Sequence, residues 1–178
     1  DINAKILFVG LAPAAHGGTR TGRVFTGDKS SDFLYKCLHK AKISNQSNSD
    51  HINDGLKIYN TYITPALKCV PPQDKPEKKE LDNCFIYLKQ EFELLKNVKI
   101  IVALGKIGFD ACMYFYKKKY DFKEKLKFGH GFIYKLPNNM KIVGCYHPSP
   151  RNVNTGRINE KKMVALFTKV SKLSKKMS

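Results

Sequence analysis

Apolar residues along the chain form two kinds of pattern, short unbroken runs and stripes that recur every three or four positions. Short apolar runs are typical of buried parallel strands, and they occur at residues 4–10, 98–105, 131–136 and 141–146. Stripes at helical spacing predict helices at residues 31–41, 76–96, 106–118 and 159–173. We expect Ser30 or Ser31 to cap the first helix. Residues 56–70 are interpreted as extended and then irregular, because Pro65 is incompatible with a central strand.

Strands that alternate with helices predict an α/β fold, here a three-layer α/β/α sandwich with a mostly parallel central sheet. At 178 residues the chain has the length of a single domain. Ligands of such sheets bind outside the carboxyl ends of the strands. Two loops of unusual composition, residues 10–28 and 146–157, follow predicted strands at that edge. We therefore expect the functional site there.

The first of these loops is rich in glycine, which lets the backbone turn through positive φ and approach a ligand closely. Its spacing matches neither the GxxxxGK[ST] phosphate loop nor the GxGxxG dinucleotide pattern. Phe25 is interpreted either as a plug that anchors the loop to the core or as a surface on which a flat base stacks. Asp28 precedes a predicted helix, so the residue pattern allows either an N-cap or a general base.

The second loop places His147 directly between a predicted strand and two prolines that flank one serine. Such a histidine has a fixed direction, which catalysis requires, so we favour a functional role for it. The loop also holds residues suited to phosphate contacts or to neutral hydrogen bonds: Ser149, Arg151, Asn152, Asn154 and Arg157.

Charge and cysteine content narrow the class of protein. Lys and Arg number 32 against 15 Asp and Glu, a formal net charge of +17. This predicts an anionic partner, with nucleic acid ahead of a membrane surface, although a Lys-rich and Asn-rich composition leaves part of the charge as solvated surface. The five cysteines are odd in number and scattered, which favours a reducing, cytoplasmic location over secretion. No apolar run reaches about 18 residues and no signal-peptide pattern is present.

Two stretches, GLAPAAHGGTRTGRVFTGD at residues 10–28 and HPSPRNVNTGR at residues 147–157, resemble the signature motifs of the uracil-DNA glycosylase superfamily. The resemblance is to its type-5, or B-type, iron–sulfur branch. TPALKCVPPQDKPEKKELDNC at residues 64–84 is similar to the segment that carries two cluster cysteines, and VALGKIGFDA at residues 102–111 is also similar. The resemblance runs along nearly the whole chain. It implies a glycosylase-like fold and a DNA-repair hydrolase that flips out uracil and cleaves its N-glycosidic bond.

The resemblance also implies roles for individual residues. Asp28 is the candidate base, because residues 10–14 lack the acid or amide found there in other branches, an absence typical of the B-type branch. Phe25 falls at the base-stacking position, His147 at the position that contacts the pyrimidine O2, and Asn152 at a second polar active-site position. The expected base contacts are Gly10, Leu11, Ala12 and Phe25. The expected DNA contacts are Arg23, Ser149, Arg151 and Arg157.

The type-5 resemblance further implies a [4Fe–4S] cluster, which needs four thiolates. Cys69 and Cys84 match two of them. The other pair of the family lies upstream of Asp1, so we expect a missing N-terminal segment with two cluster cysteines; loss of the cluster is the alternative. The remaining cysteines lie within helix or strand patterns and are interpreted as core residues: Cys37, Cys112 and Cys145.

One segment departs from the family. Thr64-Pro65-Ala66 stands where several relatives have an Asn that reads the edge of uracil. Without that amide we expect recognition through backbone groups and a broader specificity that includes hypoxanthine. Two other functions stay open, a non-catalytic DNA-binding module on the same fold and a different α/β enzyme that acts on a phosphorylated metabolite. The second would need a phosphate-binding helix start and does not explain the charge. We expect a monomer.

Overall fold

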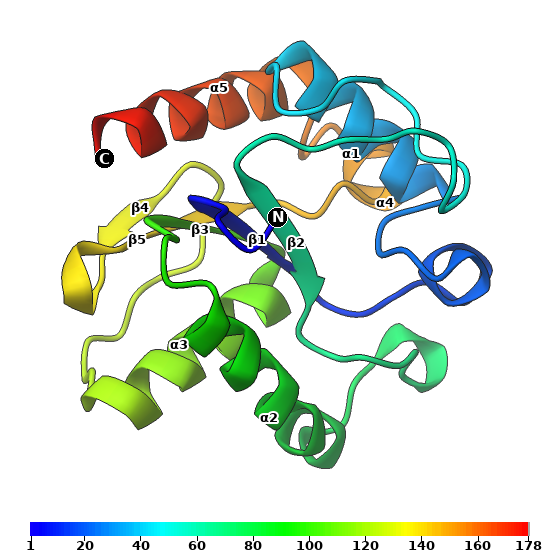
Figure 1. Cartoon of the computed structure of the whole chain (residues 1–178). Helices are drawn as coiled ribbons and strands as arrows, with labels where there is room; N and C mark the ends of the chain where they lie inside the picture. The colour runs from blue at the N-terminus through cyan, green and yellow to red at the C-terminus, as the bar shows by residue number, and fades with distance from the viewer. Residues whose placement is uncertain (178) are drawn as a thin grey trace.

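The computed structural model describes residues 1–177, apart from the side chain of Asp74. Its centre is a five-stranded sheet in the order β2-β1-β3-β5-β4 (Figure 1). All neighbouring strands are parallel except β4 and β5, so the predicted mostly parallel sheet is confirmed. The strands are β1 (Ile6–Gly10), β2 (Thr61–Pro65), β3 (Ile100–Leu104), β4 (Ile133–Lys135) and β5 (Lys141–Cys145).

Helices cover both faces of the sheet, which confirms the predicted three layers. In Figure 1, α1 and α5 lie on one side of the sheet, and α2 and α3 lie on the other. The helices are α1 (Lys29–Lys40), α2 (Lys78–Leu94), α3 (Lys106–Tyr120), α4 (Pro150–Asn154) and α5 (Glu160–Lys176). No helix within residues 1–177 combines the length and the apolar character needed to cross a membrane.

The central strands are buried on both faces, as their unbroken apolar sequences require. Because successive side chains of a strand point to opposite faces, β1 contributes to both cores. Ile6 and Phe8 pack in the layer of α1 and α5, where Phe8 meets Phe167 edge to face at 5.3 Å between ring centroids. Leu7 and Val9 pack in the layer of α2 and α3. This two-sided core fixes the register of the sheet.

The strand ends bring the two predicted loops to one edge. β1 ends at Gly10 and β5 ends at Cys145, and both strands are parallel to β3 between them. The second loop contains the short helix α4, which the sequence pattern did not indicate. The predicted serine cap of the first helix was wrong: α1 begins at Lys29, and Asp28 caps it.

Candidate active site

Asp28 closes the first loop and starts α1. Its Oδ1 accepts hydrogen bonds from the backbone N–H groups of Ser30 at 2.8 Å and Ser31 at 2.9 Å, while the Ser31 side chain receives the Asp28 N–H at 3.0 Å. The N-cap interpretation is therefore confirmed. The second oxygen, Oδ2, makes no contact with the cap and lies against the backbone of Gly17, where a Cβ atom would overlap with it. One oxygen of the Asp28 carboxylate thus caps α1, and the other lies beside Gly17 in the first loop.

Phe25 is held in an unusual backbone conformation. Its φ of 52° lies in the left-handed region, which costs a non-glycine residue about 1–3 kcal/mol and is found mainly where surrounding contacts enforce it. Ser49 supplies those contacts, since its hydroxyl donates to the Phe25 carbonyl at 3.0 Å and its carbonyl accepts from Gly27 N–H at 2.7 Å. The ring is buried against Gly10, where a Cβ would lie only 2.9 Å from Cζ. Phe25 is thus a plug at the strand end, and its role as a base-stacking surface stays a prediction.

His147 lies beside Phe25, with 6.1 Å between ring centroids and an interplanar angle of 38°. Burial lowers the pKa of the imidazole below its ordinary 6.5, and the negative charge of Asp28 partly opposes this effect. The neutral ring that results carries one N–H donor and one acceptor. Asp28 is therefore near enough to His147 for its charge to act on the pKa of the imidazole, and Phe25 lies beside the same ring.

Asn152 fixes the backbone of His147. The Asn152 side-chain amide donates to the His147 carbonyl oxygen at 2.9 Å. The backbone of Asn152 forms two hydrogen bonds of its own. Its N–H donates to the Ser149 hydroxyl, which caps α4, and its carbonyl oxygen accepts from the N–H of Ile158 at 3.1 Å. The structure therefore gives Asn152 a positioning contact with His147.

His130 is a contact that sequence reasoning missed. Its Nδ1 accepts the Tyr146 backbone N–H at 3.3 Å, and the two rings lie 5.5 Å apart. Burial lowers the pKa of His130, and a hydrogen bond to the Lys162 backbone opposes this shift. The neutral ring thus braces the residue directly before His147. The only sequence signal was a histidine between two glycines in a basic loop.

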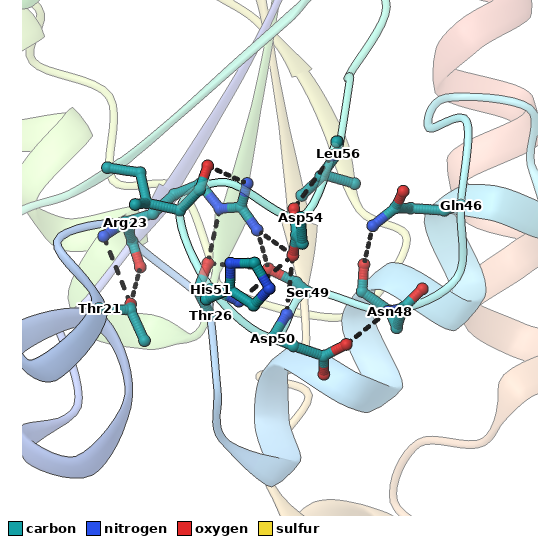
Figure 2. Close-up of polar contacts among 12 residues, drawn as sticks. Thr21, Arg23, Thr26, Gln46, Asn48, Ser49, Asp50, His51, Asp54 and Leu56 are labelled. Carbon is teal, nitrogen blue, oxygen red and sulfur yellow. Dashed lines mark hydrogen bonds and ion pairs between the residues drawn. The ribbon is translucent and has the colours of Figure 1, made fainter.

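The Arg23 guanidinium is partly buried and is held by hydrogen bonds to neighbouring side chains (Figure 2). It donates to Thr26 Oγ1 at 2.9 Å, to Ser49 Oγ at 3.0 Å and to Asp54 Oδ2 at 2.6 Å. The Asp54 side chain is only 5% exposed, and Arg23 beside it holds the pKa of that carboxyl far below its usual range. We call these four residues the loop clamp. It joins the polar loop at residues 43–55 to the segment that carries Phe25, and the expected DNA contact of Arg23 stays a prediction.

Comparison with known proteins agrees with this arrangement. The family model described as the uracil DNA glycosylase superfamily matches residues 1–171. The chain belongs to the uracil DNA glycosylase superfamily. It is 38% identical over 174 residues to a type-5 uracil-DNA glycosylase of Thermus thermophilus, with 98% of this chain and 78% of the relative covered.

Two further relatives allow the similarity of the chain to two branches of the superfamily to be compared. A type-5 uracil-DNA glycosylase of Pyrobaculum aerophilum is 41% identical over 158 residues, which cover 89% of this chain and 67% of the relative. A type-4 uracil-DNA glycosylase of Archaeoglobus fulgidus is 27% identical over 150 residues, which cover 82% of this chain and 66% of the relative. The superfamily member described here is thus more similar to these type-5 relatives than to that type-4 relative.

Thr64-Pro65-Ala66, the segment in which this superfamily member departs from its relatives, forms hydrogen bonds within the fold. The Thr64 hydroxyl donates to the Glu91 carboxylate at 2.8 Å and accepts from Lys68 Nζ at 2.7 Å. The backbone N–H of Ala66 is bonded to the Gly10 carbonyl at 2.9 Å, and the Leu11 carbonyl accepts from Leu67 at 2.8 Å. The Thr64 hydroxyl and the Ala66 N–H are therefore already committed to protein partners.

The two predicted cluster cysteines lie together. Partial desolvation, and then the neighbouring Cys84 thiol, raise the pKa of Cys69. Cys69 is exposed and Cys84 is buried. The other three cysteines are buried, as expected for core residues. Within the part of the chain that the structure describes, no group of three or more His, Cys, Asp or Glu is placed to hold a metal ion. The pair alone fits two of four cluster ligands.

Proposed function

We propose that this chain excises uracil from DNA by hydrolysing the N-glycosidic bond that joins the base to deoxyribose. The type-5 relatives are named for this activity. The observation that carries the proposal to this chain is the convergence of Asp28 and His147, a carboxylate and a neutral imidazole from distant segments, beside the Phe25 ring. All three residues come from one chain, which supports action as a monomer.

A base inside a duplex cannot reach such a site, so the nucleotide must be flipped out, at a cost of a few kcal/mol. Phe25 offers the flipped base a stacking surface whose backbone is already fixed by Ser49. Stacking of a base on an aromatic ring contributes about 1–3 kcal/mol and tolerates different bases. Part of the flipping cost is thus offset when the base stacks on this ring.

Bond cleavage builds positive charge on the sugar and negative charge on the departing base. In our proposal, the Asp28 carboxylate stabilises the sugar and orients the attacking water through Oδ2, the oxygen that the helix cap leaves unused. The His147 imidazole donates its N–H to O2 of the departing uracil. One preorganised donor of this kind contributes about 2.7–4 kcal/mol to transition-state stabilisation. Asn152 keeps His147 in place, and the backbone near Gly10, Leu11 and Ala12 is the expected contact for the base edge.

We also propose a substrate range wider than uracil. Specific rejection of an analogue requires a polar group that is left unpaired when the wrong base binds. Thr64-Pro65-Ala66 has no side-chain amide, and its hydroxyl is bonded to Glu91. Hypoxanthine is the first alternative substrate to test.

DNA contacts are proposed for the exposed residues of the second loop. Arg151 is exposed on α4, and the Arg157 guanidinium lies 4.5 Å from the centroid of the Tyr146 ring, also at the surface. Phosphate contacts from such groups position a duplex without reading its sequence. Ser149 precedes both arginines and caps the start of α4.

For the iron–sulfur cluster, we propose that Cys69 and Cys84 supply two ligands. When bound, the cluster would supply a structural cross-link between the Cys69 loop and α2. Cys84→Ser should lower the bound iron and the visible absorbance of the purified protein, and should lower its melting temperature, whereas Cys112→Ser should leave the iron content unchanged. Equal iron in the wild type and in Cys84→Ser would contradict this assignment.

Excision is tested with labelled duplexes that carry one uracil or one hypoxanthine. Incubation followed by alkali should cut the strand at the lesion, and free base should be released. Cleavage of both duplexes at comparable rates would support the wider range, and cleavage of the uracil duplex alone would exclude it. Binding without any alkali-labile site would indicate a non-catalytic DNA-binding module instead.

A further inference from the structure

The outer face of α5 carries much of the protein's unbalanced charge. This helix contains one acid and six lysines, all six of them exposed: Lys161, Lys162, Lys169, Lys172, Lys175 and Lys176. The acid, Glu160, is paired with Lys36 and Lys40 of α1. Within residues 1–177, no ion pair is formed by a lysine of α5. The positive charge of this face is therefore left for a partner outside the protein.

A second cluster of lysines, at the end of α3, is placed differently. At the end of α3, Lys118 lies over the Tyr114 ring and Lys119 over the rings of Phe115 and Tyr120, within 6 Å of each centroid. Lys119 also pairs with a glutamate of α2, and Lys123 with a neighbouring aspartate. Rings and acids within the protein thus engage three lysines of this second basic region: Lys118, Lys119 and Lys123.

The apolar side of α5 is not available to a partner. Its Met163, Phe167 and Val170 are completely buried in the layer above the sheet. An amphipathic helix that lies in a membrane surface inserts its apolar face among the lipids. α5 can offer only its charged face, which favours a polyanion of fixed shape.

The position of α5 connects this face to the candidate active site. The helix begins a few residues after Arg157 and runs from the neighbourhood of α4 to the C-terminus (Figure 1). Its 17 residues span roughly 25 Å at 1.5 Å per residue. At 3.4 Å per base pair, this is about the length of seven base pairs.

We infer that the lysine face of α5 is a second nucleic-acid contact surface, which binds the phosphates of duplex DNA beyond the damaged nucleotide and holds the enzyme on undamaged DNA. This inference rests on the proposed function, because that function makes DNA the partner of the protein. Its contacts are electrostatic and independent of sequence, so they should appear mainly in the salt dependence of binding.

The test measures binding to a labelled undamaged duplex across a salt series. The α5 variant carries Lys169→Gln, Lys172→Gln, Lys175→Gln and Lys176→Gln. The control variant has the same loss of charge at Lys118→Gln, Lys119→Gln, Lys123→Gln and Lys125→Gln, three of which contact rings or acids within the protein. Circular dichroism and thermal unfolding check that both remain folded. A parallel series uses vesicles that contain an anionic phospholipid.

Removing one lysine that neutralises a phosphate should reduce the slope of log K against log salt by about 0.9. The slope of the α5 variant should therefore fall by about 3 to 4, and that of the control by less than about 1. Equal reductions in both variants would show an effect of net charge alone and overturn the inference, as would an unchanged slope in the α5 variant. Loss of vesicle binding with an unchanged DNA slope would overturn it in favour of a membrane surface. Because the duplex is undamaged, failure of wild-type excision would contradict only the proposed function.

Discussion

The side-chain amide of Asn152 donates to the carbonyl oxygen of His147 at 2.9 Å, so α4 and the end of β5 hold each other in place. Asn152→Ala should reduce single-turnover excision about tenfold, equivalent to about 1.4 kcal/mol, because the imidazole loses its fixed position. The free energy of unfolding should fall by only about 1 kcal/mol, the usual net contribution of one hydrogen bond. Excision rates and urea unfolding check both values.

Asn154 provides the matched control, since it lies on the same short helix and is exposed. Asn154→Ala should leave the excision rate unchanged. If the Asn152 and Asn154 variants lose rate equally, the effect belongs to α4 as a whole and not to the hydrogen bond with His147.

The loop clamp should contribute to stability through Asp54. Asp54→Asn leaves the Arg23 guanidinium partly buried without its counter-charge, and breaking a buried pair in this way costs about 3 kcal/mol. The folded-state pKa of Asp54 is lowered, so its contribution is complete above the ordinary value of 3.8 and is lost as the pH falls below it. Urea unfolding at neutral and acid pH measures both effects.

Asp110→Asn removes an exposed pair with Lys106 on α3 and serves as the comparison. Such pairs contribute about 0–1 kcal/mol. A loss in Asp54→Asn no larger than in this control would show that the clamp does not stabilise the loop.

Gly17 should be required for the position of Asp28. A methyl group at residue 17 would overlap with Asp28 Oδ2 and would lie 2.9 Å from the Thr26 carbonyl oxygen. Gly17→Ala must therefore displace the carboxylate, and a misplacement of about 1 Å can cost about 10²-fold in rate. Single-turnover excision by a variant that is shown to be folded checks this. A wild-type rate would mean that the Oδ2 position does not matter.

The pH dependence of excision should reflect His147. Burial lowers its pKa below 6.5, so the neutral form persists at and above that pH. The rate should stay level above pH 6.5 and fall on the acid side as the ring gains a proton. Stability should fall over the same range, because below 6.5 the unfolded chain binds more protons than the folded one. Single-turnover rates across pH provide the measurement.

His130 has a lowered pKa as well, so a second variant must separate the two rings. Gln can accept the Tyr146 N–H through its side-chain oxygen but does not titrate. His130→Gln should therefore keep the acid-side fall in rate, whereas His147→Gln should remove it and lower the rate throughout. Disappearance of the fall in His130→Gln would show that the titrating ring is His130 and not His147.

The sequence was enough to predict that the residues following the strand ends form the candidate site. Parallel strands bring their carboxyl ends to one edge, so Asp28 and His147 were expected in one site although most of the chain separates them. The cap and catalytic interpretations of Asp28 could not be separated from sequence, because both require a carboxylate before a helix. The structure shows that Oδ1 serves the cap and that Oδ2 is left for the loop.

The contacts that hold the site could not be predicted in the same way. Ser49 and Asp54 lie in a polar loop without any periodic pattern, and tertiary packing alone brings them to Phe25 and Arg23. Arg23 was expected to contact DNA, and its bonds to Thr26, Ser49 and Asp54 could not be predicted from its sequence neighbours. The contact of His130 could not be predicted either, since the backbone N–H that it accepts belongs to a strand end distant in the sequence.

The most direct test of the account replaces Asp28 by Asn. An asparagine caps a helix as well as an aspartate does, so Asp28→Asn should keep α1 and the free energy of unfolding while it removes the charge beside the sugar. Single-turnover excision of uracil from a duplex should then fall by at least about 10²-fold, the usual loss when a positioned base is removed. An excision rate close to that of the wild type, in a protein of unchanged stability, would show that Asp28 is a helix cap only and would contradict the account.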